Sequence, residues 1–520
     1  MTMPCPIRLL APAALLLWSG VAWGAPLAEG RACLVRNDVP CALEVAERRG
    51  SAEARSAREV AFAAQASFYA GDFEEAHALL ARAVDLGWED RWDDLGLYER
   101  TAEVTQGWTV AERGRFQIRY QPGIDAVLLD DAFRALETAE RNLAPHLGAP
   151  PPGPLALEVY PDGRSFIAAS SLTRQDVLTT GVVALSKWSR LLITSPRALG
   201  RGYTWQDTIV HEYIHLVVTH HTDDRAPVWL QEAIAKYLDT RWRDGQDRFR
   251  LSVSAQGLLA AAVESGDFVS FDDMHPSLAK LPSQELAALA YAQLSTLMAF
   301  AFQQGGEDIL LRVMPRVRAG EDPQEVLATE AGFQDFAELE RGWLEYVGAL
   351  DLVQRNVASM PTVVDGGDEV DTDPLLHERR DLARFVRLGD LLRERGRHKA
   401  ALVEYGKAIP DGEPRSPLLS NRIAQSLVAL GRLDEAQLEL EASLANYPEF
   451  PLTHKTLGQI LEARGQLPRA LRSFRSAAEL NPFDPEVQRA LSDLYARLGD
   501  EANASRHQGY LHILRPGLDG

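Results

Sequence analysis

The chain has 520 residues, which is enough for two to four domains with cores of their own. Its formal net charge is −20, and no cluster of Lys and Arg interrupts this acidic balance. Because nucleic-acid partners need a surface of clustered basic side chains, the charge argues against a nucleic-acid-binding protein.

The first 24 residues are predicted to be a signal peptide. Arg8 precedes an apolar stretch from Leu9 to Trp18, and Ala22 and Gly24 are the small residues of a cleavage site after Gly24. The apolar stretch is too short to span a membrane, and we find no later segment of about 20 apolar residues. We therefore expect an exported protein, periplasmic or extracellular, with no stable membrane span after cleavage. A retained signal anchor is the alternative.

A helical region is expected over residues 25–110. It holds two cysteines, Cys33 and Cys41, and an even pair in an exported chain predicts a disulfide. Closing so short a loop would stabilise the fold by roughly 2–3 kcal/mol. Gly71 and Ala76 mark one repeat-like helical hairpin in this region, which we expect to pack against its neighbours.

Residues 111–352 alternate between strand and helix patterns, which predicts an α+β domain. The small sheet should be followed by a helix that carries the most informative motif of the chain. The predicted elements before this motif are a strand over 116–120, an amphipathic helix over 126–147, a strand over 155–160 and a strand pair at 182–185 and 191–194.

A His-Glu-x-x-His motif runs from His211 to His215. Two imidazoles four residues apart lie on one face of a helix and can hold Zn²⁺, and Glu212 can reach a water molecule beside the metal. Glu232, in the sequence Trp-Leu-Gln-Glu, begins a second predicted helix and can supply the third ligand. Three protein ligands leave one position free, which separates a catalytic zinc site from a structural one.

The surroundings of the motif favour a buried helix. Thr204 and Asp207 predict a capping box, and an apolar-rich run follows them. A chance match to the motif is expected in roughly one chain in fifty of this kind. His220 and His221 fall at the expected helix end, where the helix dipole accounts for them, and His275 is more simply structural.

The C-terminal part of the chain is repetitive. Glycines recur at intervals of 35, 34 and 34 residues, each followed five residues later by an alanine. The pairs are Gly396 and Ala401, Gly431 and Ala436, Gly465 and Ala470, and Gly499 and Ala504. A period of about 34 residues with Gly at the turn and Ala at the helix crossing resembles tetratricopeptide repeats, here over 379–516. An acidic linker over 353–378 separates them from the preceding domain.

The order of strands, motif helix and Trp-Leu-x-Glu helix resembles the gluzincin metallopeptidases, and most closely the bacterial peptidase-MA-like group. The segments that carry the resemblance are 116–120, 227–233 and 290–294, together with Trp343. It implies that His211, His215 and Glu232 bind zinc and that Glu212 is the catalytic base. It also implies that Tyr291 stabilises the oxyanion, although Tyr291 could equally be a core aromatic.

The chain departs from the pattern of that family at two places. Ala233 follows the third ligand where the family usually has Gly, a change that a helix tolerates. The Gly-x-Met-Glu-Asn sequence of gluzincin aminopeptidases is absent, and residues 181–184 occupy its region. Aminopeptidase specificity is therefore unsupported.

The sequence predicts a zinc-dependent peptidase, of endopeptidase type, whose repeats recruit a protein partner or substrate. The alternative is a catalytically silent scaffold of the same fold that acts as an exported protein-interaction module. The polar linker predicts that the repeats can be removed without unfolding the zinc domain, although such a linker permits docking as well.

Overall fold

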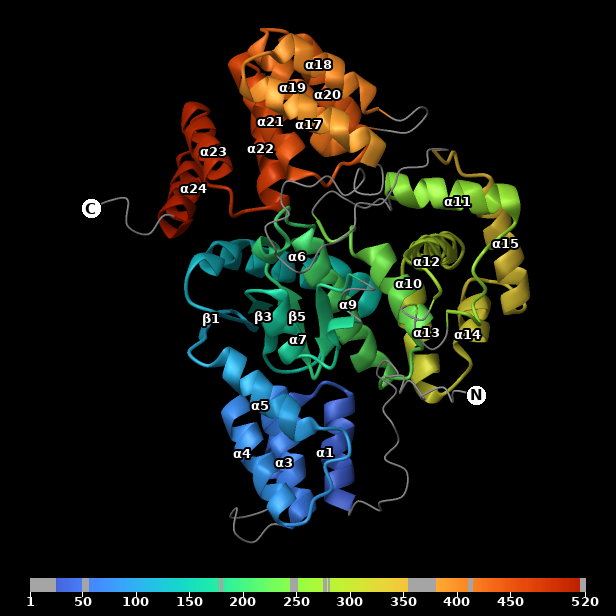
Figure 1. The fold of residues 1–520 in the computed structure, drawn as a ribbon. Helices are drawn as coiled ribbons and strands as arrows, with labels where there is room; N and C mark the ends of the chain where they lie inside the picture. Colours follow the sequence, from blue (N-terminus) through green and yellow to red (C-terminus); the bar gives the residue numbers. More distant parts are fainter. Residues whose placement is uncertain are drawn as a thin grey trace, which may run out of the picture.

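The fold is that of a computed structural model, which describes residues 25–48, 56–175, 177, 181–243, 251–274, 278, 281–353, 380–409 and 415–514. The predicted signal peptide, the linker from residue 354 onward and His275 lie outside these residues. The described chain forms N-terminal helices, a sheet with helices around it, and a row of helix pairs (Figure 1). This layout confirms the predicted fold class.

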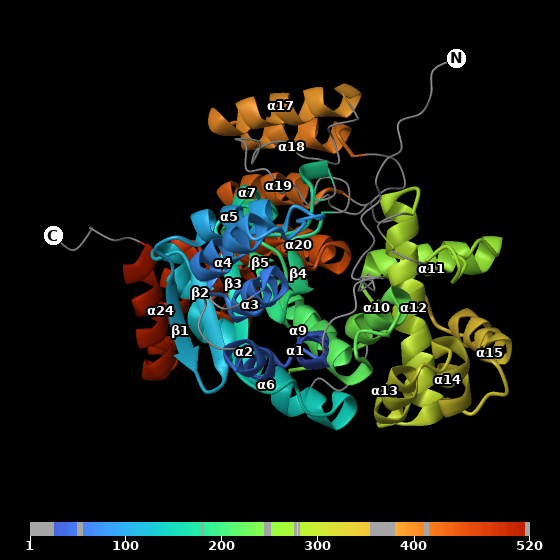
Figure 2. The same cartoon turned by 90° about the horizontal axis from the view of Figure 1, so that it is seen from below.

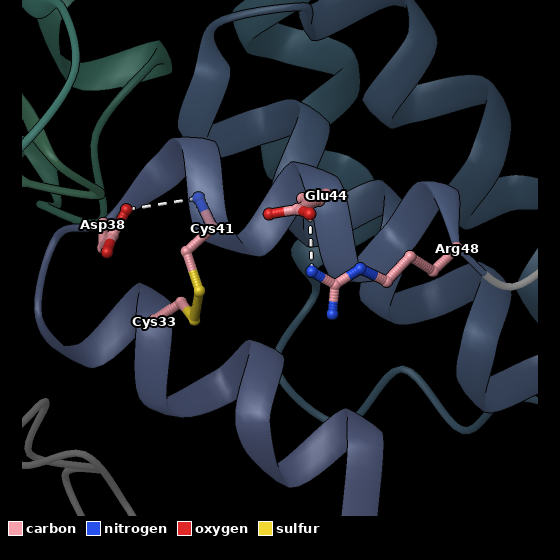
Figure 3. Close-up of a disulfide and its surroundings, with 5 residues drawn as sticks. All are labelled: Cys33, Asp38, Cys41, Glu44 and Arg48. Atoms are coloured by element: carbon pink, nitrogen blue, oxygen red, sulfur yellow. Dashed lines mark hydrogen bonds and ion pairs between the residues drawn. A yellow bond between two sulfur atoms is a disulfide. The ribbon is translucent and has the colours of Figure 1, made fainter.

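Five helices form the N-terminal part: α1 (Ala25–Val35), α2 (Val39–Glu47), α3 (Ala57–Ala70), α4 (Phe73–Asp85) and α5 (Asp94–Thr105). Cys33 and Cys41 form the predicted disulfide, which ties α1 to α2 (Figure 3). The side chain of Asp38 accepts a hydrogen bond from the backbone N–H of Cys41 and caps α2. Gly71 has a φ of +84° and turns the chain from α3 into α4, as the repeat-like hairpin predicts.

A mixed sheet follows, with the strand order β1-β2-β3-β5-β4. Its strands are β1 (Thr109–Arg113), β2 (Phe116–Tyr120), β3 (Leu155–Tyr160), β4 (Ala184–Lys187) and β5 (Arg190–Thr194). β3 pairs in parallel with β2 and β5, and the outer strands β1 and β4 are antiparallel to their neighbours. β1 escaped prediction because both of its faces are largely exposed. It begins two residues before the domain boundary expected at residue 111.

The two faces of the sheet are covered differently. Leu157 and its strand neighbours pack in the core with α6 (Leu129–Leu147) and α9 (Trp205–Thr222). On the other face, the fully buried Glu158 and Arg190 form an ion pair with N···O distances of 2.7 and 2.9 Å. The Arg190 guanidinium lies 4.7 and 4.6 Å from the ring centres of Phe68 and Phe73, so the N-terminal helices close this face.

Short helices connect these elements: η2 (Ile124–Leu128), α7 (Gly163–Ala168) and η3 (Pro196–Leu199). A helical block then completes the domain with α10 (Val228–Leu238), α11 (Val253–Ser265), α12 (Gln284–Gly305), α13 (Ile309–Ala319), α14 (Pro323–Glu330) and α15 (Phe336–Gly348). The helix α12 runs through the middle of this block (Figure 2).

The helix α12 is an apolar segment whose length the sequence patterns did not predict. Over Glu285–Gly305 this helix is long and apolar enough to cross a membrane, contrary to the expectation that no later segment approaches that length. However, 72% of that window is buried inside the protein. Its apolar character therefore follows from its place in the core.

The repeats form four helix pairs: α17 (Arg380–Glu394) with α18 (His398–Lys407), α19 (Pro417–Ala429) with α20 (Leu433–Asn446), α21 (Pro451–Ala463) with α22 (Leu467–Leu480), and α23 (Pro485–Arg497) with α24 (Glu501–Leu514). The four periodic glycines all have positive φ, and the four alanines are buried. Leu388 of the first pair is 45% exposed, because no described helix pair precedes it.

The repeats are docked on the sheet domain. Tyr510 of α24 belongs to the same hydrophobic core as α6 and α9, and Arg506 forms an ion pair with Asp131 of α6. At a second contact, the backbone N–H of Tyr203 donates a 3.1 Å hydrogen bond to the carbonyl oxygen of Leu480. In Figure 1 the repeats and the N-terminal helices lie at opposite ends of the sheet domain.

Candidate metal centre

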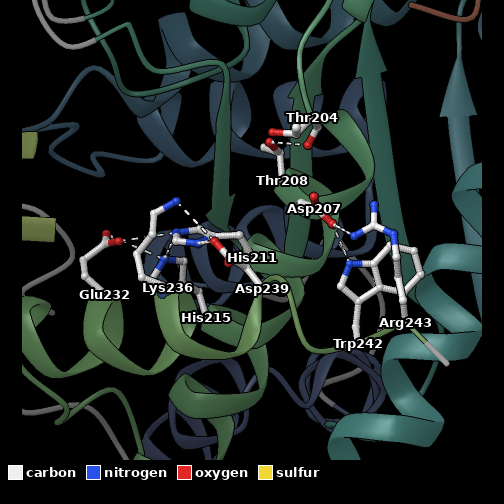
Figure 4. A network of polar contacts seen from close by, with 10 residues as sticks. All are labelled: Thr204, Asp207, Thr208, His211, His215, Glu232, Lys236, Asp239, Trp242 and Arg243. Atoms are coloured by element: carbon white, nitrogen blue, oxygen red, sulfur yellow. Dashed lines mark hydrogen bonds and ion pairs between the residues drawn. The ribbon is translucent and has the colours of Figure 1, made fainter. Parts of the chain in front are cut away.

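The three predicted ligands converge at one point. His211 and His215 project from α9 and Glu232 from α10, and their ligand atoms all lie within 4.8 Å of one another (Figure 4). The two Nε2 atoms are 3.1 Å apart, and the Glu232 oxygens lie 3.3 Å from His211 Nε2 and 3.6 Å from His215 Nε2. Tetrahedral ligands of zinc are about 3.3–3.6 Å apart, so both separations from Glu232 fall in this range and the two Nε2 atoms lie slightly closer together.

The chemistry of the cluster also fits a cation. The three side chains are only 12%, 14% and 18% exposed, and Oε2 of Glu232 is buried 3.3 Å from Nε2 of His211 with no other hydrogen-bond partner in the described chain. Burial lowers the pKa of His215 to about 4. The pKa of His211 rises to about 9, because hydrogen bonds with Asp239 and Glu232 outweigh the opposing effects of burial and Lys236.

Asp239 orients the first histidine. Its Oδ2 lies 3.2 Å from Nδ1 of His211 and 3.2 Å from Nζ of Lys236. A carboxylate on Nδ1 fixes the ring so that Nε2 faces the metal. The sequence analysis missed this residue. Glu232, Lys236 and Asp239 share one face of α10 at positions i, i+4 and i+7, and that spacing was the available signal.

Glu212 lies between the cluster and the sheet. Its side chain is 8% exposed, and burial raises its pKa to about 7, while His211 and a hydrogen bond with the backbone of Ser186 act to lower the pKa. Ser186 belongs to β4, which is an edge strand of the sheet. A carboxyl group with this environment can take up a proton near neutral pH.

Tyr291 of α12 also faces the site. Its pKa is raised well above the ordinary value, first by the charge of Glu232, then by burial and by Glu212. The ring centre of Tyr291 lies 5.7 Å from Nζ of Lys236. Tyr291 therefore lies near the metal cluster, and its ring also packs against the hydrophobic core of the domain.

The predicted capping box of α9 is wrong. Thr204 does occupy the N-cap position, but its side chain makes no capping hydrogen bond. Asp207 instead accepts a 2.7 Å hydrogen bond from Nε1 of Trp242 and forms an ion pair with Arg243. These two donors come from the segment after α10 and bind the carboxylate more favourably than a free backbone N–H would.

The two histidines at the end of α9 lie away from the metal cluster, as predicted. His220 Nδ1 is 2.6 Å from the carbonyl oxygen of Arg36, and His221 Nε2 is 2.8 Å from that of Ala149. Burial lowers the pKa of the His221 imidazole, and its hydrogen bond with Ala149 opposes that shift.

Comparison with known proteins identifies two families within this chain. The Peptidase MA superfamily matches residues 137–349, and the tetratricopeptide repeat family matches residues 421–471 and 455–505. The fold is thus an α+β peptidase-like domain followed by a helical repeat array. The chain carries a Peptidase MA superfamily domain and C-terminal tetratricopeptide repeats.

Individual relatives are more distant. The BBSome complex member BBS4 of Bos taurus is 30% identical over 114 residues, and the match spans 22% of this chain and 22% of that protein. Among solved structures, MamA 41-end from Desulfovibrio magneticus RS-1 is 22% identical with a TM-score of 0.24, covering 28% of this chain and 81% of that chain. YrrB, titled a TPR protein with an unusual peptide-binding site, is 17% identical with a TM-score of 0.23, covering 28% of this chain and 84% of that chain.

Proposed function

We propose that this protein is a zinc-dependent peptidase of endopeptidase type, with His211, His215 and Glu232 as metal ligands and Glu212 as the base. The observation that carries the proposal is the convergence of the three ligand atoms within 4.8 Å, with Glu212 one residue from the first ligand. We further propose that the repeats recruit a protein substrate or partner.

The residues of the chain divide the reaction between them. Zinc, when bound, acts as a Lewis acid that activates water and polarises the peptide carbonyl. Glu212 accepts the proton of the attacking water and delivers it to the leaving amine. The hydroxyl of Tyr291 donates a hydrogen bond to the oxyanion that develops on the carbonyl oxygen. Asp239 holds the ring of His211 in the orientation that its role as a ligand requires.

The substrate is proposed to bind as an extended peptide along β4. An edge strand presents unpaired backbone N–H and C=O groups that can pair with another chain. β4 is such a strand, and its Ser186 hydrogen bonds with Glu212, so a peptide on this edge would lie beside the proposed base. This mode places no demand for a free amino terminus, in agreement with endopeptidase action.

We also propose that the protein is exported. The disulfide between Cys33 and Cys41 supports this location, since such bonds persist in oxidising compartments. Cell fractionation together with the intact mass of the mature protein tests it. We expect an extracytoplasmic protein that begins after Gly24, and a mass that includes the first 24 residues would instead favour the signal anchor.

The central test measures zinc and hydrolysis separately. We expect about one zinc ion per chain by elemental analysis, and cleavage of casein or an unstructured peptide that a chelator abolishes. Glu212→Gln keeps the size and polarity of the side chain but removes the base, so this variant should retain zinc and lose nearly all hydrolysis.

Matched histidine variants locate the site. His211→Ala should lower zinc affinity sharply, whereas His220→Ala, on the same helix but away from the cluster, should not. A chain that takes up no zinc would rule out the proposed site. A chain that binds zinc but cleaves no protein or peptide would favour the scaffold alternative.

A further inference from the structure

One turn of the repeat array packs on the peptidase domain near the start of α9, the helix that carries His211 and His215. The turn between α20 and α21 spans residues 447–450. Its aromatic residues Tyr447 and Phe450 form an apolar cluster in which Val253 of α11 takes part. The guanidinium of Arg201 lies 5.9 Å from the ring centre of Phe450. The turn is thereby held on the peptidase domain from two sides.

A second contact fixes the array next to the start of α9. Gly202 has a φ of +71°, and a Cβ added there would come 2.1 Å from the carbonyl oxygen of Leu480. Only glycine permits this close approach and the adjacent hydrogen bond from Tyr203 to Leu480. Because residues 202–204 lead directly into α9, the array and the ligand-bearing helix share one supporting segment.

Glu449 stands between the two aromatic residues of the turn and has an exposed side chain. Its carboxyl group interacts electrostatically with Asp207, Lys236 and Asp239 of the peptidase domain. Lys236 is paired with Asp239, and Asp207 is paired with Arg243 (Figure 4). No ion pair links Glu449 to a residue of the described chain. Of the three carboxylates Asp207, Asp239 and Glu449, only that of Glu449 therefore has no cationic partner.

The environment of Glu449 favours a cationic partner. Partial desolvation by the surrounding protein raises the pKa of its carboxyl group, Asp207 and Asp239 raise it further, and Lys236 opposes them. A carboxylate with excess negative charge around it gains from a nearby cation. The free cations that an extended peptide brings to such a site are the side chains of Lys and Arg.

We propose that Glu449, a residue of the repeat array, is a specificity-determining residue of the peptidase site and selects peptides with a Lys or Arg side chain close to the scissile bond. This inference rests on the proposed peptidase function. The array in this arrangement is part of the substrate site itself, in addition to any distant recruitment by its other surfaces.

The test uses the full-length chain and two unstructured fluorescent peptides that differ only in Lys or Glu at the positions flanking a central Ala-Leu pair. Binding is measured by fluorescence anisotropy on the non-cleaving Glu212→Gln chain, and kcat/KM is measured on the parent. We compare Glu449→Gln and Glu449→Lys with Glu394→Gln, which removes an exposed carboxylate from α17.

We expect the parent to prefer the lysine peptide by at least about threefold at low salt, the preference to vanish in Glu449→Gln, and to reverse in Glu449→Lys. Glu394→Gln should keep the parental preference. An unchanged preference in both Glu449 variants would overturn the assignment. If no peptide is cleaved but binding still shows the Glu449-dependent preference, the peptidase function fails while the role of Glu449 in binding stands.

Discussion

Substitution of Asp239 tests the hydrogen bond to His211 and leaves the three proposed metal ligands unchanged. Its carboxylate holds Nδ1 of His211, and a neutral amide is a weaker acceptor. We expect Asp239→Asn to lower zinc affinity about 10- to 100-fold, as the loss of such a partner typically does. Competition with a chromophoric chelator measures the affinity.

The matched control for Asp239 is Asp223→Asn. Asp223 caps the far end of α9 and forms an ion pair with Arg318, 3.0 Å away, so its loss should affect stability without changing zinc affinity. Equal zinc affinities of Asp239→Asn and the parent would mean that other contacts are sufficient to orient His211.

Substitution of Tyr291 distinguishes a catalytic role of its hydroxyl group from a structural role of its ring. If its hydroxyl donates a hydrogen bond to the oxyanion, Tyr291→Phe should lower kcat by about 10²- to 10³-fold with zinc content retained and KM little changed. Tyr346→Phe, which keeps the ring that stacks on Phe300, should be nearly as active as the parent. Steady-state kinetics decide this, and a kcat of Tyr291→Phe near that of the parent would make Tyr291 a core aromatic.

The residues of the site differ in how far they can be found from the sequence. The ligands and Glu212 follow from a local rule, because the spacing of His211 and His215 fixes their common face on any helix. Lys236 and Asp239 share the face of α10 that carries Glu232, but their place beside His211 depends on the way α10 packs on α9, which the spacing alone does not give. Glu449 could not be predicted from the sequence, because its place near the proposed peptidase site depends on the docking of the repeat array.

Helices and strands could be predicted where the residue pattern in the sequence follows directly from the geometry of the element. The glycine and alanine period of the repeats gives the turns and crossings of four helix pairs, and the alternation over 116–120 gives β2. β1 lacked such a pattern, because most of its side chains face solvent. The capping box failed because Asp207 found stronger partners distant in sequence.

Gly202 tests the contact between two elements, α22 and the segment before α9. Gly202→Ala combines left-handed strain with a clash against the carbonyl oxygen of Leu480. Gly431→Ala is the matched control, because Gly431 also has positive φ but open space around it. We expect the control to cost about 1–2 kcal/mol from backbone strain alone and Gly202→Ala to cost more. Equal losses of unfolding free energy in urea would show that the contact adjusts easily.

At the scale of the whole molecule, the N-terminal helices and the C-terminal repeats both pack against the sheet domain. Arg190 ties the N-terminal hairpin to one face of the sheet, and Tyr510 of the last repeat enters the core on the other. The polar linker was compatible with a detachable array and with a docked one, since linker composition carries no information on the surfaces it joins. The contacts at Leu480, Arg506 and Tyr510 show the docked arrangement.

Docking predicts that the repeats and the peptidase domain unfold together. All 10 tryptophans precede the repeats, so tryptophan fluorescence follows the rest of the chain while circular dichroism follows all helices. We expect the two signals of the parent to change in one urea transition. Tyr510→Ala removes a ring that is 6% exposed and costs about 3 kcal/mol, so the transitions should separate.

The control for this experiment is Tyr495→Ala. Tyr495 is 9% exposed and belongs to the core of the repeats themselves, where it stacks on His507. Its loss weakens the array but leaves the docking contacts in place, so the two signals should still coincide at a lower urea concentration. Coincident transitions in Tyr510→Ala would mean that the remaining docking contacts, among them the ion pair of Arg506 and the contact at Leu480, suffice to couple the two domains.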